Sequence, residues 1–127
     1  MDGDLKVLLV QRRIEPYQEF WSLPGGFVHM DESLEQAALN KLKEKTNVDD
    51  IYVEQLYTFG DIDRDPRARV ITIAYYALVS SENFTLKPSD AVSDVKWHSI
   101  YALPELAFDH GRILAYALQR LRNDARP

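Results

Sequence analysis

The feature that most constrains this sequence is a change of hydrophobic periodicity across a Pro-Gly-Gly turn. Before the turn, residues 5–12 (LKVLLVQR) form an apolar, β-branched run that predicts a strand. After the turn, apolar residues recur at i, i+3, i+4 and i+8, the spacing of one helix face. These residues are Leu34, Ala37, Ala38 and Leu42. A strand followed by an amphipathic helix must share its core with further strands, so the chain predicts an α+β fold.

Local signals mark the ends of the expected helices. Ser33 followed by Gln36 fits a capping box, and Asn47 suits a left-handed C-terminal cap. Three more strands are expected, over residues 51–59, 69–79 and 95–99. Asp109 is expected to cap a last helix. The order strand, loop, helix, strands, helix predicts a mixed β-sheet sandwiched between helices, an α/β/α arrangement.

Length and charge narrow the function classes. The 127 residues suit a single domain spanning 1–127. With 20 acidic and 15 basic residues, the net charge of -5 argues against binding to nucleic acid or an anionic membrane. The absence of cysteine excludes disulfides, thiol nucleophiles and cysteine-ligated metals. No leader segment and no transmembrane-length apolar run is found, so a cytoplasmic location is expected.

The segment around the glycine pair resembles the box of the Nudix family, G-x5-E-x7-R-E-U-x-E-E-x-G-U, where U is a bulky aliphatic residue. The positions that match at the right spacing are Gly26, Glu32, Leu42, Glu44 and Val48. The resemblance covers nearly the whole chain, and it implies the Nudix fold.

The chain departs from this box at the positions that carry chemistry. Asn40 stands where the family has arginine, and Asn47 stands where it has glycine. The resemblance implies three helix carboxylates, with a charge of -3, that bind Mg²⁺ or Mn²⁺. Here Lys41, Glu44 and Lys45 carry +1 instead. A hard divalent cation needs several oxygens, so this set predicts that the metal-dependent hydrolase site is dismantled.

Two interpretations of the lysines stay open. Lys41 and Lys45 are either ordinary solvated helix surface or a counter-charge that replaces the metal beside a bound diphosphate. In both cases no catalytic residue is predicted, and only Glu32 and Glu44 remain from the catalytic set. No cofactor is required, and Glu44 is the one candidate metal ligand. Mg²⁺ or Mn²⁺ would be needed only by a hydrolase.

A second signature lies in the rest of the chain. It comprises residues 55–61 (QLYTFGD), 64–67 (RDPR), 70–78 (VITIAYYAL), 106–110 (LAFDH) and 113–118 (ILAYAL). This pattern is similar to the Nudix-related transcriptional regulators and to related ADP-ribose pyrophosphatases. In the regulators, the resemblance implies, a non-hydrolytic Nudix domain binds an effector, commonly ADP-ribose, and a winged helix binds DNA. Their usual context is NAD metabolism.

The residue types are compatible with such a ligand, and each also has a purely structural interpretation. The candidate ligand-binding residues are Arg12, Arg64, Arg67 and Lys41 for phosphate charge, Gly25 and Gly26 for backbone approach to phosphate, Trp21, Phe59 and Phe108 for stacking, Asp61 and Asp65 for ribose hydroxyls, and His110 as a further contact.

Both ends of the expected family domain are short. The family strand that precedes the turn at residues 2–4 is absent, which predicts an open sheet edge and favours a homodimer. The winged helix is also absent, so no nucleic acid binding is expected from this chain alone.

Three functions follow in order. The first is effector binding without efficient hydrolysis. The alternative is a metal-dependent hydrolase, an ADP-ribose pyrophosphatase with relocated ligands at Glu32, Glu44 and Asp61. The last is a structural or dimerisation module.

Overall fold

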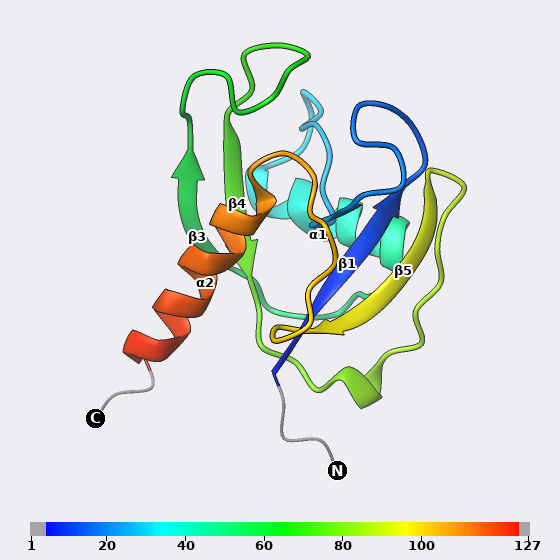
Figure 1. The fold of residues 1–127 in the computed structure, drawn as a ribbon. Helices are drawn as coiled ribbons and strands as arrows, with labels where there is room; N and C mark the ends of the chain where they lie inside the picture. The colour runs from blue at the N-terminus through cyan, green and yellow to red at the C-terminus, as the bar shows by residue number, and fades with distance from the viewer. Residues whose placement is uncertain (1–4, 125–127) are drawn as a thin grey trace.

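The computed structural model describes residues 5–124, and the turn expected at residues 2–4 lies outside them (Figure 1). Its elements are β1 (Lys6–Arg12), β2 (Trp21–Ser22), α1 (Leu34–Thr46), β3 (Glu54–Phe59), β4 (Thr72–Tyr76), a 3-10 turn (Ser81–Asn83), β5 (Val92–Ser99) and α2 (His110–Asp124). All the expected helices and strands are found. β4 is shorter than the predicted 69–79, and the two-residue β2 was not predicted.

The described strands form two antiparallel sheets rather than one continuous sheet. One has the order β2-β1-β5, and the other pairs β3 with β4. A parallel bridge between Trp21 and Leu106 adds the mixed character to the first sheet. In the described part of the chain, β4 has no strand partner other than β3.

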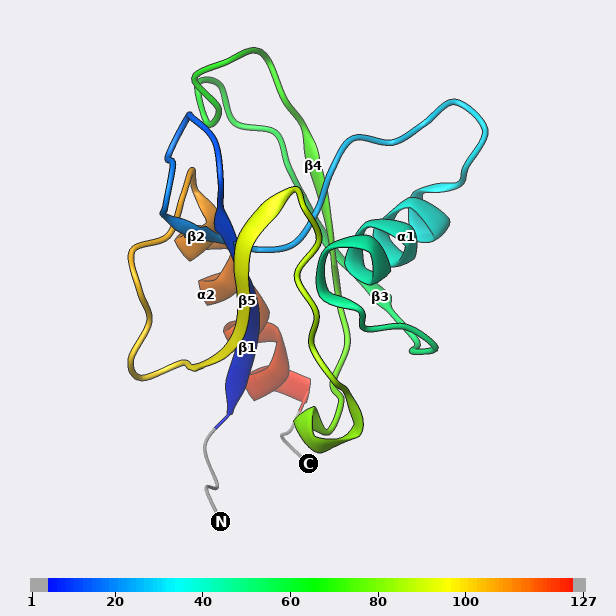
Figure 2. The ribbon, with the colours of Figure 1, turned by 90° about the vertical axis from the view of Figure 1, so that its right-hand side faces the viewer.

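The helices lie on opposite sides of the strands, so the α/β/α arrangement is confirmed (Figure 2). α1 contacts β4 and β5. On the other side, Ile113 of α2 packs against Leu56 and Phe59 of β3. A separate core cluster, made of Val10, Val92 and Val95, joins β1 to β5. The chain therefore has one core cluster for each sheet.

Both predicted ends of α1 are confirmed. The Ser33 hydroxyl accepts a hydrogen bond from the N–H of Gln36 at 3.1 Å. Asn47 has φ 72° and ψ 11°, in the left-handed region, and its N–H donates to the Lys43 carbonyl at 2.9 Å. Local sequence signals are sufficient here because both caps are made within one helical turn.

The start of α2 differs from the expectation in one respect. Asp109 directly precedes the helix, and its backbone carbonyl accepts from the N–H of Arg112 at 2.9 Å. Its carboxylate, however, does not act as the predicted side-chain cap. It accepts two hydrogen bonds from Arg64, at 2.7 and 2.9 Å. A guanidinium forms a stronger, charge-assisted pair with a carboxylate than a neutral backbone N–H does.

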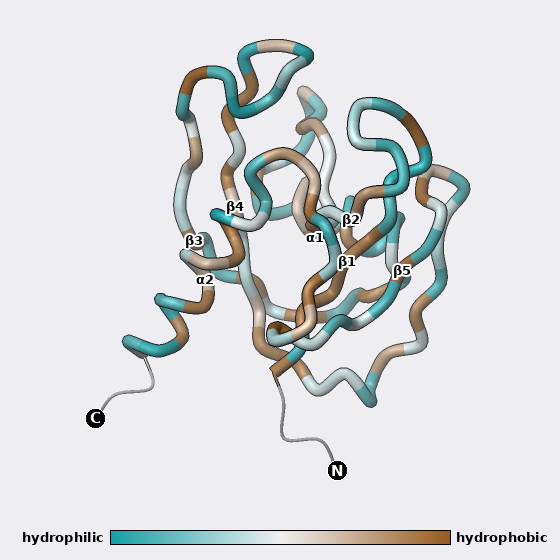
Figure 3. The backbone as a smooth tube through the Cα atoms, in the orientation of Figure 1, coloured by the Kyte–Doolittle hydropathy of each residue, from teal (hydrophilic) through white to brown (hydrophobic). Residues whose placement is uncertain are grey.

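A cavity of about 840 Å³ opens between the two sheets and α1. Aliphatic and aromatic residues of β1, β4 and α2 form much of its wall, while charged loop residues line one end. Figure 3 shows the same division, with apolar backbone along β1 and mostly hydrophilic loops at the upper end. In the described part of the chain, no helix is long and apolar enough to cross a membrane.

Candidate ligand-binding site

The charged end of the cavity is surrounded by three loops and the start of α2. The loops are residues 13–20, 23–33 and 60–71, and they lie at the same end of the molecule (Figure 1). Each loop follows a strand, so the sheets hold its first residue in place. Polar side chains from distant parts of the sequence meet at this end.

Phe108 lies at the centre of this cluster. The guanidinium carbon of Arg12 is 4.8 Å from the Phe108 ring centroid, and that of Arg67 is 5.1 Å away. The Tyr17 ring is 4.8 Å from the same ring. Phe108 itself has φ 53°, a left-handed conformation that costs a bulky residue free energy. Such strain is typical of binding sites, where the surrounding contacts hold the residue.

Arg67 is fixed by Asp65. The Asp65 carboxylate accepts from the N–H, the Nε and an Nη atom of Arg67, at 2.9, 3.0 and 2.6 Å. The hydrogen bond from Arg67 lowers the pKa of Asp65, so the carboxylate stays charged. Its side chain is only 5% exposed. Asp65 therefore orients a guanidinium, and it is not an open acceptor for ribose hydroxyls in this state.

Arg64 is similarly engaged. Its guanidinium makes the two hydrogen bonds to Asp109, and the side chain is 5% exposed. A third bond joins it to the Val70 carbonyl at 3.3 Å. Arg64 thus connects the 60–71 loop to α2 instead of presenting free donors to a ligand.

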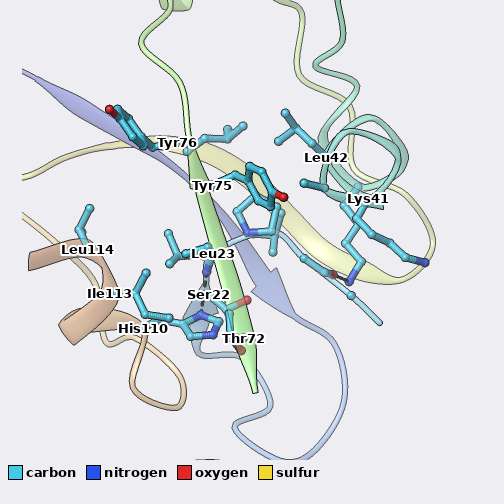
Figure 4. Close-up of a pocket in the computed structure, with 18 of the residues that line it drawn as sticks. Ser22, Leu23, Lys41, Leu42, Thr72, Tyr75, Tyr76, His110, Ile113 and Leu114 are labelled. Atoms are coloured by element: carbon cyan, nitrogen blue, oxygen red, sulfur yellow. Dashed lines mark hydrogen bonds between the residues drawn. The ribbon is translucent and has the colours of Figure 1, made fainter. Parts of the chain in front are cut away.

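His110 connects the glycine turn to α2. Its Nδ1 accepts a hydrogen bond from the Leu23 N–H at 3.0 Å, as the dashed line in Figure 4 shows. Burial lowers the pKa of His110 to about 4, so the imidazole is neutral at physiological pH. A neutral ring is required, because only an unprotonated Nδ1 accepts this bond. His110 lines the cavity, and the geometry gives it a positioning role.

The glycine pair makes a close approach to α1. A Cβ atom on Gly26 would lie 2.8 Å from both Cδ and Cε of Lys41, whereas one on Gly25 would meet nothing within 4 Å. Neither glycine has a positive φ, so the expected left-handed conformation is wrong. The Lys45 ammonium donates a hydrogen bond to the Gly25 carbonyl. Gly26 is needed for space, and both lysines of the altered box contact the turn.

These contacts bring four cationic side chains close together, and we call Arg12, Lys41, Lys45 and Arg67 the cation cluster. The pKa of Lys45 is lowered by burial first, then by the charge of Lys41, with a smaller contribution from Arg12. Burial and the charge of Arg67 lower the pKa of Arg12. Mutual repulsion of this kind destabilises the empty site, and an anion relieves it.

The carboxylates of the region do not fit a divalent metal ion. Glu32 accepts from the His29 N–H and from the Asn40 side chain, both at 2.9 Å. Glu44 lies 3.7 Å from the Lys41 ammonium. Among residues 5–124, no three acidic or histidine side chains are grouped as ligands. One carboxylate between two ammonium groups does not replace the several oxygens that Mg²⁺ prefers.

Three other candidates lie away from the cation cluster. Phe59 is 3% exposed and packs in the core, so it offers no open stacking surface. Trp21 contacts the His98 ring, with centroids 4.5 Å apart. Asp61 is exposed and forms an ion pair with Arg112. Sequence reasoning missed Phe27, whose ring lies 5.9 Å from the guanidinium carbon of Arg67. Its position directly after the glycine pair was the available signal.

Comparisons with known proteins agree with the fold and the site. The family model for the NUDIX domain matches residues 1–117. The ADPR responsive transcriptional repressor NtrR of Acinetobacter baylyi is 38% identical over 98% of this chain and 51% of its own length. The ADP-ribose pyrophosphatase of Methanocaldococcus jannaschii is 34% identical over 90% of this chain and 66% of its own length. The chain therefore spans about half of the first relative and about two thirds of the second.

Solved structures give the same result. The NUDIX domain of Shewanella oneidensis NrtR complexed with ADP ribose has a TM-score of 0.89 and 45% identity, covering 95% of this chain and 80% of that one. NrtR from the same organism complexed with a 27mer DNA has a TM-score of 0.84 and 45% identity, covering 98% and 58%. The expected exclusion of nucleic acid is not supported by this relative. With the altered box and the matched fold, the chain belongs to the NUDIX domain family.

Proposed function

We propose that this domain binds ADP-ribose, or a related nucleoside diphosphate or sugar ligand, without efficient hydrolysis, as the effector-binding domain of a transcriptional regulator. The observation that carries the proposal is the cation cluster at the charged end of the cavity. Adjacent cations in a partly desolvated site stabilise a diphosphate, which carries its negative charge on neighbouring groups. The ligands in the names of the relatives agree with this chemistry.

The same residues argue against efficient hydrolysis. Lysine ammonium groups neutralise phosphate charge, but they do not lower the pKa of a bound water as a divalent metal does. Figure 4 places Lys41 on the α1 side of the cavity. Glu32 and Glu44 are engaged by protein donors, which leaves no acidic pair poised to take a proton from water.

The test is a titration with ADP-ribose in EDTA, followed by the melting temperature. A ligand that binds only the folded state raises stability by about 2.7 kcal/mol at 100 times its Kd. NAD and arabinose are titrated in parallel to identify the effector class. AMP release is then measured with Mg²⁺ and with Mn²⁺. Stabilisation without turnover supports the proposal, and AMP release at an enzymatic rate supports the alternative of a metal-dependent hydrolase.

The double variant Lys41→Glu, Lys45→Glu tests the cation cluster directly. It changes the local charge by four units and restores carboxylates at two box positions. In EDTA we expect it to lose stabilisation by ADP-ribose. Equal binding by the variant and the parent protein without metal would refute the role of the lysines. The exposed Lys43→Glu variant, on the same helix, is the matched control.

We further propose that the domain forms a homodimer through its open sheet edge, in the cytoplasm, and requires the remainder of a regulator to bind DNA. Sedimentation velocity gives the oligomeric state. Fluorescence anisotropy with a labelled DNA duplex tests the last point, and tight binding by this chain alone would contradict it.

A further inference from the structure

Phe27 is an exposed aromatic side chain at the edge of the site. It is 67% exposed, although a phenylalanine ring is stabilised by burial. It follows Gly26, whose backbone contacts the Lys41 side chain, so the ring begins one residue away from the cation cluster. Residues 24–29 form no helix or strand, and the ring is not fixed by a regular element.

Arg67 gives this exposed ring a rigid neighbour. The three hydrogen bonds from Asp65 fix the guanidinium, and its carbon lies 5.1 Å from the Phe108 ring and 5.9 Å from the Phe27 ring. The Phe108 side of this arrangement is crowded by Arg12 and Tyr17. The Phe27 side is exposed, and the Arg67 side chain is itself 43% exposed.

A planar aromatic group matches this geometry better than an aliphatic or sugar group does. Nucleobases stack on aromatic rings and on guanidinium planes, with little dependence on the base. A flat ring placed between Phe27 and Arg67 would cover the exposed ring without breaking any hydrogen bond to Asp65. Phosphates attached to that flat ring would extend toward Lys41 and Lys45.

We propose that Phe27 and Arg67 form a subsite for the nucleobase end of the ligand. The inference rests on the proposed function and narrows it to nucleoside diphosphates. The cation cluster holds the diphosphate of any such ligand, while the Phe27–Arg67 subsite distinguishes ADP-ribose from a phosphorylated sugar that lacks a base. Phe27 is thus a specificity-determining residue.

The experiment compares Phe27→Ala, Phe27→Leu and the parent protein, with ADP-ribose and inorganic pyrophosphate as probes in EDTA. Isothermal titration calorimetry is the readout. We expect both variants to bind ADP-ribose about tenfold more weakly, the effect of losing one base-stacking contact, and to bind pyrophosphate unchanged. Met30→Ala is the matched control, because Met30 is fully exposed in the same loop.

A second measurement detects the base itself. Phe27→Trp places an indole in the subsite, and stacking on adenine should quench its fluorescence when ADP-ribose is added but not when pyrophosphate is added. The parent protein supplies the background of Trp21 and Trp97.

Unchanged ADP-ribose affinity in Phe27→Ala and Phe27→Leu, or quenching by both probes, would overturn the subsite while leaving the proposed function intact. A parent protein that binds neither probe would overturn both.

Discussion

Removing Asp109 should destabilise this domain strongly, because Arg64 would be left with a buried, unpaired charge. The Arg64 side chain is 5% exposed and that of Asp109 is 18% exposed. Breaking such a pair from one side costs about 3–5 kcal/mol. Since the Val70 carbonyl still accepts one hydrogen bond from Arg64, and Asp109 is partly open to water, we expect about 3 kcal/mol for Asp109→Ala.

A double-mutant cycle separates the pair from its surroundings. Arg64→Met removes the buried cation and keeps much of the side-chain volume. We expect Asp109→Ala in the Arg64→Met background to cost about 2 kcal/mol less than in the parent protein, since no charge is then stranded. Urea unfolding followed by circular dichroism gives each free energy.

The exposed pair of Lys43 and Asp49 is the control. Its atoms are 3.0 Å apart, yet both side chains are more than half exposed, at 51% and 58%. Asp49→Ala should therefore cost less than about 1 kcal/mol. If Asp109→Ala costs no more than Asp49→Ala, burial does not control the energy of the Arg64–Asp109 pair, and the reasoning is refuted.

Three other outcomes are expected. Gly26→Ala should displace the Lys41 side chain and weaken pyrophosphate binding by calorimetry, whereas Gly25→Ala, with nothing within 4 Å of the new Cβ, should not; equal affinities would contradict this. Burial lowers the pKa of His110 from 6.5 to about 4, so as pH falls from 6.5 to 4 the unfolded chain takes up a proton that the folded protein does not. The parent protein should then lose up to about 3 kcal/mol more than His110→Gln over this range in urea unfolding, and parallel losses would exclude the His110 contribution. Ser33→Ala should lower the free energy of unfolding by about 1 kcal/mol through the N-cap of α1, and an unchanged urea midpoint would argue against that cap.

Sequence alone predicted features that depend on residues near each other in the chain. The α1 caps at Ser33 and Asn47 and the position of α2 are set within a few residues, and all were predicted. The altered box was also readable, because Lys41 and Lys45 occupy fixed positions on one helix.

Features that depend on distant partners were not predicted. Arg64 finds Asp109 45 residues further along the chain, and this pairing removes both from the roles that their residue types suggested. Phe59 is buried by α2, which no local pattern around Phe59 indicates. The division of the strands into two sheets is equally non-local, since alternation and β-branching identify a strand but not its neighbour.

The two sheets have separate core clusters, and this separation affects how the molecule opens. A two-stranded hairpin held on one side by a helix is a natural unit of local unfolding, so β3 and β4 can open while β1 and β5 stay closed. The site spans both units. Arg12 ends β1, whereas Arg67 lies in the loop that joins β3 to β4. An anion held by both arginines would tie two separately opening halves into one cooperative unit, and hydrogen exchange in β4 would slow on ligand binding.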